Sequence, residues 1–152
     1  MKKFSLFLLA IVLTIVISGC GKTNEKILEC NIFSEGNNMN AYGKIKYVFK
    51  NDILEIGNVE VIFKDITLDN LDYWWDSIKK QFSEQNKPVT IDGYKRSFKS
   101  DDKNYSFTVN VEVDYTKISD TTLNEYNIED YRGKSYDEVK KLSLELEGVT
   151  CK

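Results

Sequence analysis

The most reactive side chains in this sequence are three cysteine thiols, Cys20, Cys30 and Cys151. The 152-residue chain contains no histidine. Histidine is the base of Ser-His-Asp and Cys-His catalytic sites and a ligand in many zinc sites, so its absence excludes these classes. Any catalysis would have to depend on carboxylates or on a serine–lysine pair.

Carboxylates are abundant, but their spacing suggests only one cluster. Asp69, Asp72 and Asp76 are three and four residues apart, which places them on one helical face where they could bind a divalent cation. The simpler interpretation is that acidic side chains favour the positive end of the helix dipole. Pairs suited to glycoside hydrolysis arise by chance among 24 acidic residues. We therefore expect no metal, no cofactor and no enzymatic activity.

Aromatic side chains provide the candidate binding residues. Trp75 belongs to the apolar face of a predicted helix, whereas Trp74 is rotated by about 100° and should lie at its edge or in solvent. Partly exposed aromatic rings are favoured at binding surfaces, so Tyr73 and Trp74 are candidates, together with Tyr126 and Tyr131 in a polar segment further along the chain. The alternative is that Trp74 packs beneath a neighbouring loop.

The first residues have the pattern of an export signal. Lys2 and Lys3 precede an almost unbroken apolar run over residues 4–17. As a helix this run would reach about 21 Å, which is shorter than the roughly 30 Å hydrocarbon core of a bilayer. A permanent transmembrane helix is therefore the weaker alternative.

The residues Ile17-Ser18-Gly19-Cys20 directly follow this run and resemble the lipobox of bacterial lipoproteins. The resemblance implies that a diacylglyceryl group is attached to the Cys20 thiol and that a signal peptidase cuts before Cys20. Two or more acyl chains hold a protein stably on a bilayer. The alternative is an ordinary secreted protein, cut elsewhere, in which Cys20 is a free thiol.

These features divide the chain into a signal peptide (1–19), a lipidated N-terminus with a polar tether (20–26) and a single globular domain (27–152). Loss of Lys2 and Lys3 with the leader would change the formal charge from −3 to −5. A negative domain does not attract nucleic acid through a general positive field. We expect a monomer on the outer, extracytoplasmic face of the cell membrane, held there by its N-terminal lipid.

Cys30 and Cys151 remain when Cys20 carries lipid. Two cysteines in an oxidising compartment favour a disulfide, which would join the two ends of the domain. In the chain-entropy model, closing a loop of about 120 residues contributes roughly 5 kcal/mol. The alternative, two free thiols used in redox or metal chemistry, lacks a C-x-x-C spacing.

Alternating polar and apolar residues predict several β-strands. The clearest run covers residues 105–115. Residues 44–50 also alternate, and Asn51-Asp52 is placed to join them to the run 53–63 in a tight hairpin. Gly57-Asn58 interrupts the second strand of this hairpin and predicts a bulge. Further strands are predicted at 29–33 and 94–99.

Two segments have a helical period. The first covers residues 69–86, with Thr67 or Asp69 as the N-cap. The second starts at the capping-box sequence 135–138 and stops before Gly148. We therefore predict an α+β fold: an antiparallel sheet of about four to five strands with two amphipathic helices packed on one face.

The order of lipobox, hairpin, helix, long strand and closing helix resembles that of the small YehR-like bacterial lipoproteins. The similarity spans most of residues 43–148 and lies in the segments IKYVFKNDILEI, VNVEVDYTKI and YDEVKKLSLELEG. This family has no established biochemical role, so the resemblance implies a compact α+β domain and no catalytic residue.

The sequence therefore predicts a membrane-anchored extracytoplasmic lipoprotein whose domain is a non-enzymatic binding or interaction module. Its partner would be an envelope protein or a small ligand. Two alternatives stay open. A carboxylate-dependent hydrolase acting on an envelope polymer would need two acids across a cleft, and a structural subunit of a membrane complex would show a flat apolar face.

Overall fold

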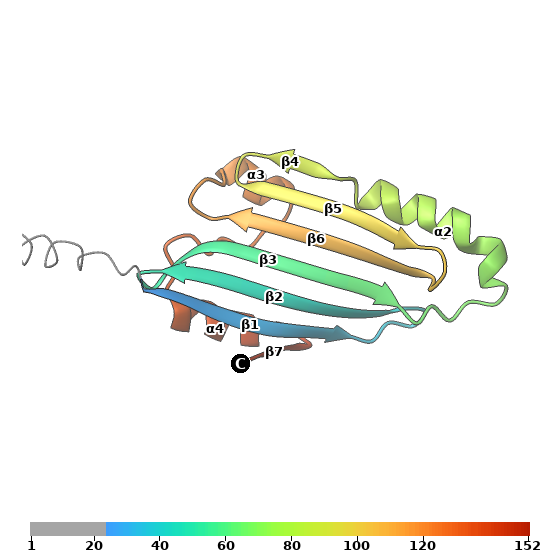
Figure 1. The fold of residues 1–152 in the computed structure, drawn as a ribbon, viewed down its shortest axis with the longest axis horizontal. Helices are drawn as coiled ribbons and strands as arrows, with labels where there is room; N and C mark the ends of the chain where they lie inside the picture. Colours follow the sequence, from blue (N-terminus) through green and yellow to red (C-terminus); the bar gives the residue numbers. More distant parts are fainter. Residues whose placement is uncertain (1–23) are drawn as a thin grey trace, which may run out of the picture.

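The fold is taken from a computed structural model, which describes residues 24–152, so the predicted signal peptide and Cys20 lie outside the described residues. The described chain forms one seven-stranded antiparallel sheet in the order β4-β5-β6-β3-β2-β1-β7 (Figure 1). The strands are β1 (Glu25–Ser34), β2 (Asn40–Lys50), β3 (Ile53–Lys64), β4 (Val89–Ile91), β5 (Tyr94–Asp101), β6 (Ser106–Asp114) and β7 (Val149–Cys151). The helices are α2 (Leu71–Gln85), α3 (Asp120–Glu125) and α4 (Tyr136–Leu144).

The α+β class predicted from the sequence is confirmed, but the sheet has seven strands instead of four to five. The additional strands, β4 and β7, have three residues each. The additional helix, α3, has six residues. Elements of this length are too short to display a period of 2 or 3.6 residues, so alternation could not reveal them.

The predicted β2–β3 hairpin is present, and its turn has the expected chemistry. Asn51 and Asp52 both have positive φ, 52° and 67°. Two such residues fit the turn whose twist matches that of antiparallel strands, and Asn and Asp tolerate this conformation. The bulge is not at Gly57-Asn58, however. The register shifts between Val48 and Phe49 of β2, and Gly57 pairs regularly with Tyr47.

Side chains alternate between the two sides of each strand, so the sheet has two distinct faces. Ile45, Val59, Val111 and Arg96 stand side by side across β2, β3, β6 and β5. We call their side the packed face, because the helices lie on it. The neighbouring row of Lys44, Glu60, Asn110 and Ser97 lies on the opposite side, which we call the open face. An antiparallel sheet with one solvated face explains the alternation in the sequence.

Helix α2 packs on one end of the packed face through aromatic rings. The Phe82 ring lies 4.4 Å from the Phe107 ring and 5.0 Å from the Phe63 ring. Trp75 stacks on Phe107 at 4.8 Å. The predicted helix is present, but it begins at Leu71, two residues later than predicted, and its N-cap is Asn70 and not Thr67 or Asp69. Asn70 adopts a left-handed conformation and makes no side-chain cap.

Helix α4 packs on the other end of the same face. Val139 is fully buried, and the Tyr136 ring lies 5.3 Å from that of Phe49. The predicted capping box is present: the Glu138 carboxylate accepts hydrogen bonds from the backbone N–H of Ser135 at 2.9 Å and from its hydroxyl at 2.8 Å. Packing and capping therefore begin the helix at the residue that the sequence indicated.

The first described residues lie at the α4 end of the sheet. The backbone N–H of Asn51 donates to the carbonyl of Asn24. Glu25 and Lys26, which we expected in the tether, already pair with Lys50 and Phe49 in β1. None of the helices within residues 24–152 has the length and apolar character needed to cross a membrane.

A disulfide joins Cys30 and Cys151, as predicted. The two residues are direct partners in the β1–β7 ladder, so the bridge connects the first strand to the last. Cys30 is almost fully buried. The bond thus helps to hold the C-terminal strand at the edge of the sheet, together with three residue pairs and the backbone hydrogen bonds from Phe33 to Gly148 and from Lys152 to Glu29.

Candidate ligand-binding groove

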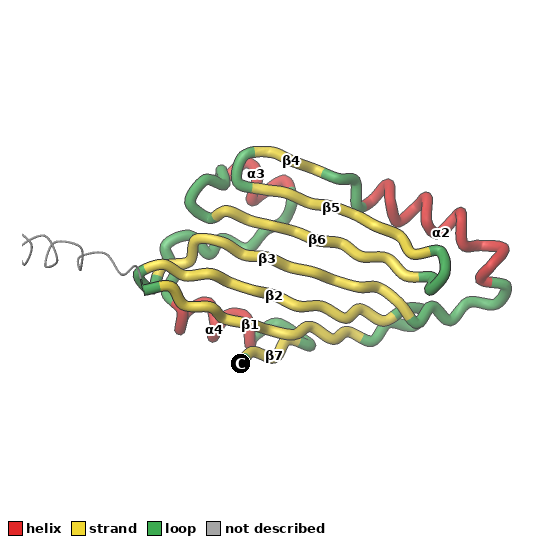
Figure 2. Tube along the Cα trace, in the orientation of Figure 1, coloured by secondary structure: helices red, strands yellow, loops and turns green. Residues whose placement is uncertain are grey.

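The helices do not cover the packed face along its full length. α2 covers one end, and α3, α4 and the loop between them cover the other (Figure 2). A cavity of about 390 Å³ lies between these two groups, and we call it the groove. Its floor is the sheet itself, formed by apolar residues of β2, β3 and β6: Ile45, Gly57, Val59, Val109, Val111 and Val113.

The middle of the floor is open because no helix side chain reaches it. Val59 and Val111 are only half-buried although they lie on the two central strands of this face. A valine side chain on the inner face of a sheet is normally buried by the helices that pack on that face. Val59 and Val111 pack against the core but keep part of their surface accessible, which is suited to contact with a ligand.

Gly57 shapes the end of the floor nearest α4. A Cβ atom on Gly57 would lie 3.1 Å from Cε2 of Tyr115 and 3.5 Å from Cδ1 of Tyr47. The first contact is tighter than an ordinary van der Waals contact, whereas the second is an ordinary one. Glycine at this strand position therefore suits the close approach of the Tyr115 ring.

Tyrosine rings form the walls of the groove. Tyr94 of β5 stacks on Tyr126 with their ring centroids 4.6 Å apart. On the α4 side, Tyr131 packs edge-on against Tyr47 at 5.9 Å and stacks near Tyr115 at 6.1 Å. Such pairs are rigid, because each ring holds its neighbour in one rotamer.

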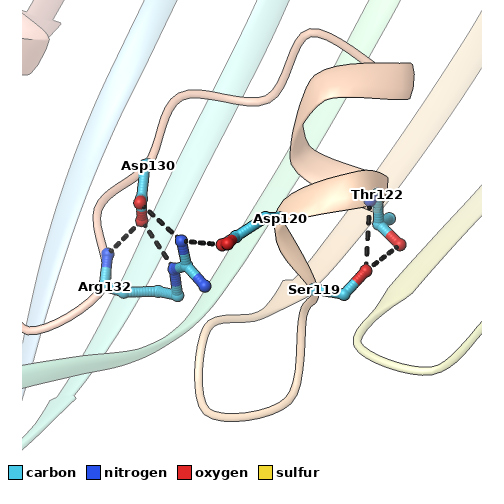
Figure 3. Close-up of polar contacts among 5 residues, drawn as sticks. All are labelled: Ser119, Asp120, Thr122, Asp130 and Arg132. Atoms are coloured by element: carbon cyan, nitrogen blue, oxygen red, sulfur yellow. Dashed lines mark hydrogen bonds and ion pairs between the residues drawn. The ribbon is translucent and has the colours of Figure 1, made fainter.

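The segment that carries Tyr126 and Tyr131 is held in place by polar contacts around Arg132 (Figure 3). The Arg132 guanidinium donates to Asp130 at 2.7 and 2.9 Å and to Asp120 at 2.6 Å. Ser119 caps α3 by accepting from the backbone N–H of Thr122 at 3.1 Å. These contacts therefore fix the loop that carries Tyr126 and Tyr131.

Arg96 is the charged side chain that rises from the floor of the groove. It is half-buried, its Nε donates to the carbonyl of Lys87 at 3.0 Å, and its guanidinium lies 5.6 Å from the ring centre of Tyr126. No carboxylate within residues 24–152 forms an ion pair with it. A half-buried cation without an anionic partner is a natural point of attachment for a negative group.

Buried hydroxyl groups lie at the α4 end of the groove. Burial raises the pKa of Tyr131 to about 12 and also raises the pKa of Tyr47 and Tyr115. All three therefore stay neutral at physiological pH and can donate hydrogen bonds. The fully buried hydroxyl of Ser143 near Tyr47 and Tyr131 has no protein partner in good hydrogen-bonding geometry.

Glu129 is the acidic side chain that lines the groove, and it is exposed at the rim. Glycoside hydrolysis requires two carboxyl groups at a fixed separation, of which one has a raised pKa. Elsewhere, Asp101 and Asp102 have pKa values lowered by hydrogen bonds, from Asn104 and Trp75 respectively. The groove thus presents a cation, several phenols and one peripheral carboxylate.

A second depression, of about 350 Å³, lies on the open face. It is lined by opposite charges that face each other across strands, such as Lys44 and Glu60. Cross-strand pairs of this kind stabilise a solvated sheet surface. The depression lacks aromatic or other deep walls, so we consider the groove the better candidate site.

The structure separates the four candidate binding residues into two pairs. Tyr126 and Tyr131 line the groove. Tyr73 and Trp74 lie on the first turn of α2, with 78% and 50% of their surfaces exposed and their rings in T-shaped contact at 4.9 Å. Trp74 is therefore not packed beneath a loop. Cys20, the candidate lipid attachment residue, lies outside the described residues.

The acidic cluster on α2 is used in local contacts. Asp72 accepts a hydrogen bond from the hydroxyl of Tyr105, and Asp76 pairs with Lys79 at 3.2 Å. No group of three metal-ligating side chains occurs within the described part of the chain. Asp69 lies before the N-cap Asn70 and outside α2, so the prediction that all three acids share one helical face is wrong; Asp72 is the acid in the first turn.

Sequence reasoning missed Arg96, Tyr94 and Gly57 as groove residues. Arg96 alternates with exposed lysines in β5, so its pattern is that of any solvated strand. Arg96 could have been recognised as a groove residue only from its pairing with an apolar residue of the neighbouring strand. The register of that pairing cannot be read from one sequence. The groove is assembled from seven separate segments of the chain and has no local motif.

The fold and the groove together define an α+β protein with one antiparallel sheet and a tyrosine-walled cavity on its helical face. No family model matches the chain, and no curated protein matches it. A solved structure described as "NMR structure of the protein from Streptococcus pneumoniae TIGR4" superposes with a TM-score of 0.52 at 10% identity, covering 88% of each chain. At this identity the similarity shows a shared fold alone.

Proposed function

We propose that this protein is an extracytoplasmic lipoprotein that is anchored through Cys20 and binds a ligand in the groove without chemically changing it. The observation that carries the binding role is the cavity of about 390 Å³ between α2 and the α3–α4 segment. Small-ligand sites have volumes of roughly 300 to 1,000 Å³ and combine apolar walls with a few polar groups. The valine floor, tyrosine walls and Arg96 have this composition.

The non-enzymatic part of the proposal is supported by the groove lining. Among residues 24–152, no serine, threonine or cysteine side chain lines the groove, and its carboxylate, Glu129, is exposed. A hydrolase acting on an envelope polymer would need a nucleophile or a second acid. Binding requires neither.

The lipid anchor is supported by the lipobox-like residues Ile17 to Cys20 and by the short distance to the fold. β1 begins at Glu25, so four residues (21–24) separate the proposed lipid from the sheet, and the extended chain from Cys20 to Glu25 reaches roughly 18 Å at most. The α4 end of the domain would therefore lie close to the bilayer. The intact mass of the protein tests this: a diacylglyceryl adduct on a chain that starts at Cys20 is expected, whereas an unmodified thiol would refute the anchor.

The binding role can be tested by crosslinking in the native membrane. Leu146 lines the groove and Leu144 does not, yet both are 50% exposed. We expect a photoreactive amino acid at 146 to form an adduct of defined mass that is absent when the same amino acid is placed at 144. Equal labelling at both positions would contradict a ligand held in the groove.

Tyr73 and Trp74 support a second candidate role, contact with a protein partner. They are exposed at the end of the domain opposite Glu25, since Thr67, just before α2, bonds to Asn38 in the β1–β2 loop. With the proposed anchor, this pair would face away from the membrane. Trp74→Ala should reduce crosslinking of the lipidated protein to that partner but leave labelling at position 146 unchanged.

A further inference from the structure

We infer that the ligand of the groove carries a carboxylate or similar anion on a flat, apolar body, with the anion bound by Arg96 and the body lying between the tyrosine walls. This inference rests on the proposed binding function and specifies its chemistry. It starts from the position of Arg96, whose partners in the neighbouring strands are Val111 in β6 and Val89 in β4, with Val59 of β3 beyond Val111.

The first argument is the unmatched charge. Arg96 uses its Nε toward the Lys87 carbonyl, and no carboxylate of the described chain pairs with it. The two terminal NH₂ groups of the guanidinium can therefore donate in parallel to the two oxygens of a carboxylate. Partial burial strengthens that contact relative to one on an open surface.

The second argument is that the guanidinium is oriented before a ligand arrives. It lies over the Tyr126 ring, which in turn stacks on Tyr94. A planar group fixed in this way loses little freedom on binding. The remaining charged side chain of the lining, Glu129, is exposed at the rim, where solvent screens its repulsion of an anion.

The third argument concerns the body of the ligand. The space beside Arg96 is bounded below by Val59 and Val111 and laterally by tyrosine rings. Such surfaces favour stacked or edge-on rings over a highly hydrated chain. A ring-bearing carboxylate satisfies both the cation and the apolar floor, either as a free small acid or as the C-terminal residue of a peptide.

The full-length chain in mild detergent is titrated with 3-phenylpropionate and, separately, with its neutral analogue 3-phenylpropan-1-ol. Binding of each probe is measured from the NMR chemical shifts of Val59 and Val111. We expect the acid to bind at least about tenfold more tightly than the alcohol. A difference of about tenfold corresponds to about 1.4 kcal/mol. The tripeptide Gly-Gly-Phe and its C-terminal amide are compared in the same way, which distinguishes a free acid from a peptide end.

The variants separate the charge from the cavity. Arg96→Gln should weaken binding of the acid about tenfold and leave binding of the alcohol unchanged, while Arg96→Lys should retain most of the preference. The matched control is Lys95→Gln, which removes the same charge from the adjacent residue on the open face. Val59→Phe fills the floor and should abolish binding of both probes.

Two results overturn the inference: equal affinity for acid and alcohol, or equal loss of acid binding in Arg96→Gln and Lys95→Gln. If Val59→Phe still blocks the probes in that case, a groove-binding function stands without the anion. If instead the probes shift resonances elsewhere and Val59→Phe has no effect, the groove itself is not the binding site and the proposed function fails as well.

Discussion

Gly57 and Tyr47 stand directly opposite each other on β3 and β2, and the missing side chain of Gly57 leaves room for the rings of Tyr47 and Tyr115. Because Tyr115 also stacks near Tyr131, it cannot move away from a new methyl group without disturbing the groove wall. This contact connects the strand register to the shape of the binding site.

Gly57→Ala should therefore destabilise the protein, although alanine normally suits a strand better than glycine. We expect a loss of about 1 to 3 kcal/mol in the free energy of unfolding, which is typical of overpacking. Urea denaturation provides the measurement. A gain in stability would show that the two rings move readily to accommodate the methyl group and that the groove wall is not rigid.

The disulfide should make a large contribution to stability. Cys30→Ala combined with Cys151→Ala removes a bond that closes a loop over a sequence separation of 121 residues. We expect the free energy of unfolding to fall by about 2 to 5 kcal/mol, measured by urea denaturation.

The parent protein treated with dithiothreitol is the control for the disulfide variant, because it loses the bond but keeps both sulfur atoms. Its free energy of unfolding should match that of the double variant within about 1 kcal/mol. A double variant as stable as the oxidised parent would mean that β7 is held by its neighbours alone.

Acid should weaken the loop that holds the tyrosine wall. The Arg132 guanidinium lowers the pKa of Asp130 to about 2, whereas an aspartate in the unfolded chain titrates near about 3.9. The folded-state pKa is the lower one, so this pair contributes stability above about pH 4 that is lost as the pH falls toward 2. The contribution is small, because both side chains are partly exposed.

The measurement is urea unfolding of Asp130→Asn and the parent at several pH values. The variant should be less stable at neutral pH, and the difference should shrink below about pH 4. Glu129→Gln is the control, since Glu129 is exposed and forms no ion pair. A difference that stays constant with pH would exclude the ion pair as its source.

Ser143→Ala should be tolerated in spite of complete burial. The Ser143 hydroxyl has no well-placed hydrogen-bond partner, so its removal relieves a buried polar group. We expect unchanged stability or a gain of about 1 kcal/mol. Ser135→Ala, which loses the hydroxyl that donates to Glu138, should cost about 1 kcal/mol in the same assay. If Ser143→Ala costs more, the hydroxyl forms a hydrogen bond, for which the hydroxyls of the nearby Tyr47 and Tyr131 are the candidates.

Local patterns in the sequence predicted most of the long elements. The alternation over 105–115 indicated β6, and Ser135 with Glu138 located the start of α4, because both signals lie within a few residues. α2 was found from its apolar period, but its cap was not, since Asn70 uses its backbone conformation and no side-chain hydrogen bond.

The site was much less accessible to sequence reasoning. Tyr126 and Tyr131 were chosen because aromatic residues stood out in a polar segment, and they do line the groove. Tyr73 and Trp74 were chosen for the same reason and lie elsewhere on α2. Arg96 gave no signal, because its importance depends on which residues of β3 and β6 stand beside it, and that is fixed by long-range pairing.

The position of β1 has a mechanical consequence. Its ten residues run antiparallel to β2, and Cys30 ties it to β7 on the other side. A pulling force applied before Glu25 acts along the strand axis, so the β1–β2 hydrogen bonds share the load in shear instead of opening singly. If the proposed lipid anchors the domain through its N-terminus, force from the membrane reaches the domain along β1. The domain would therefore resist mechanical unfolding in that direction.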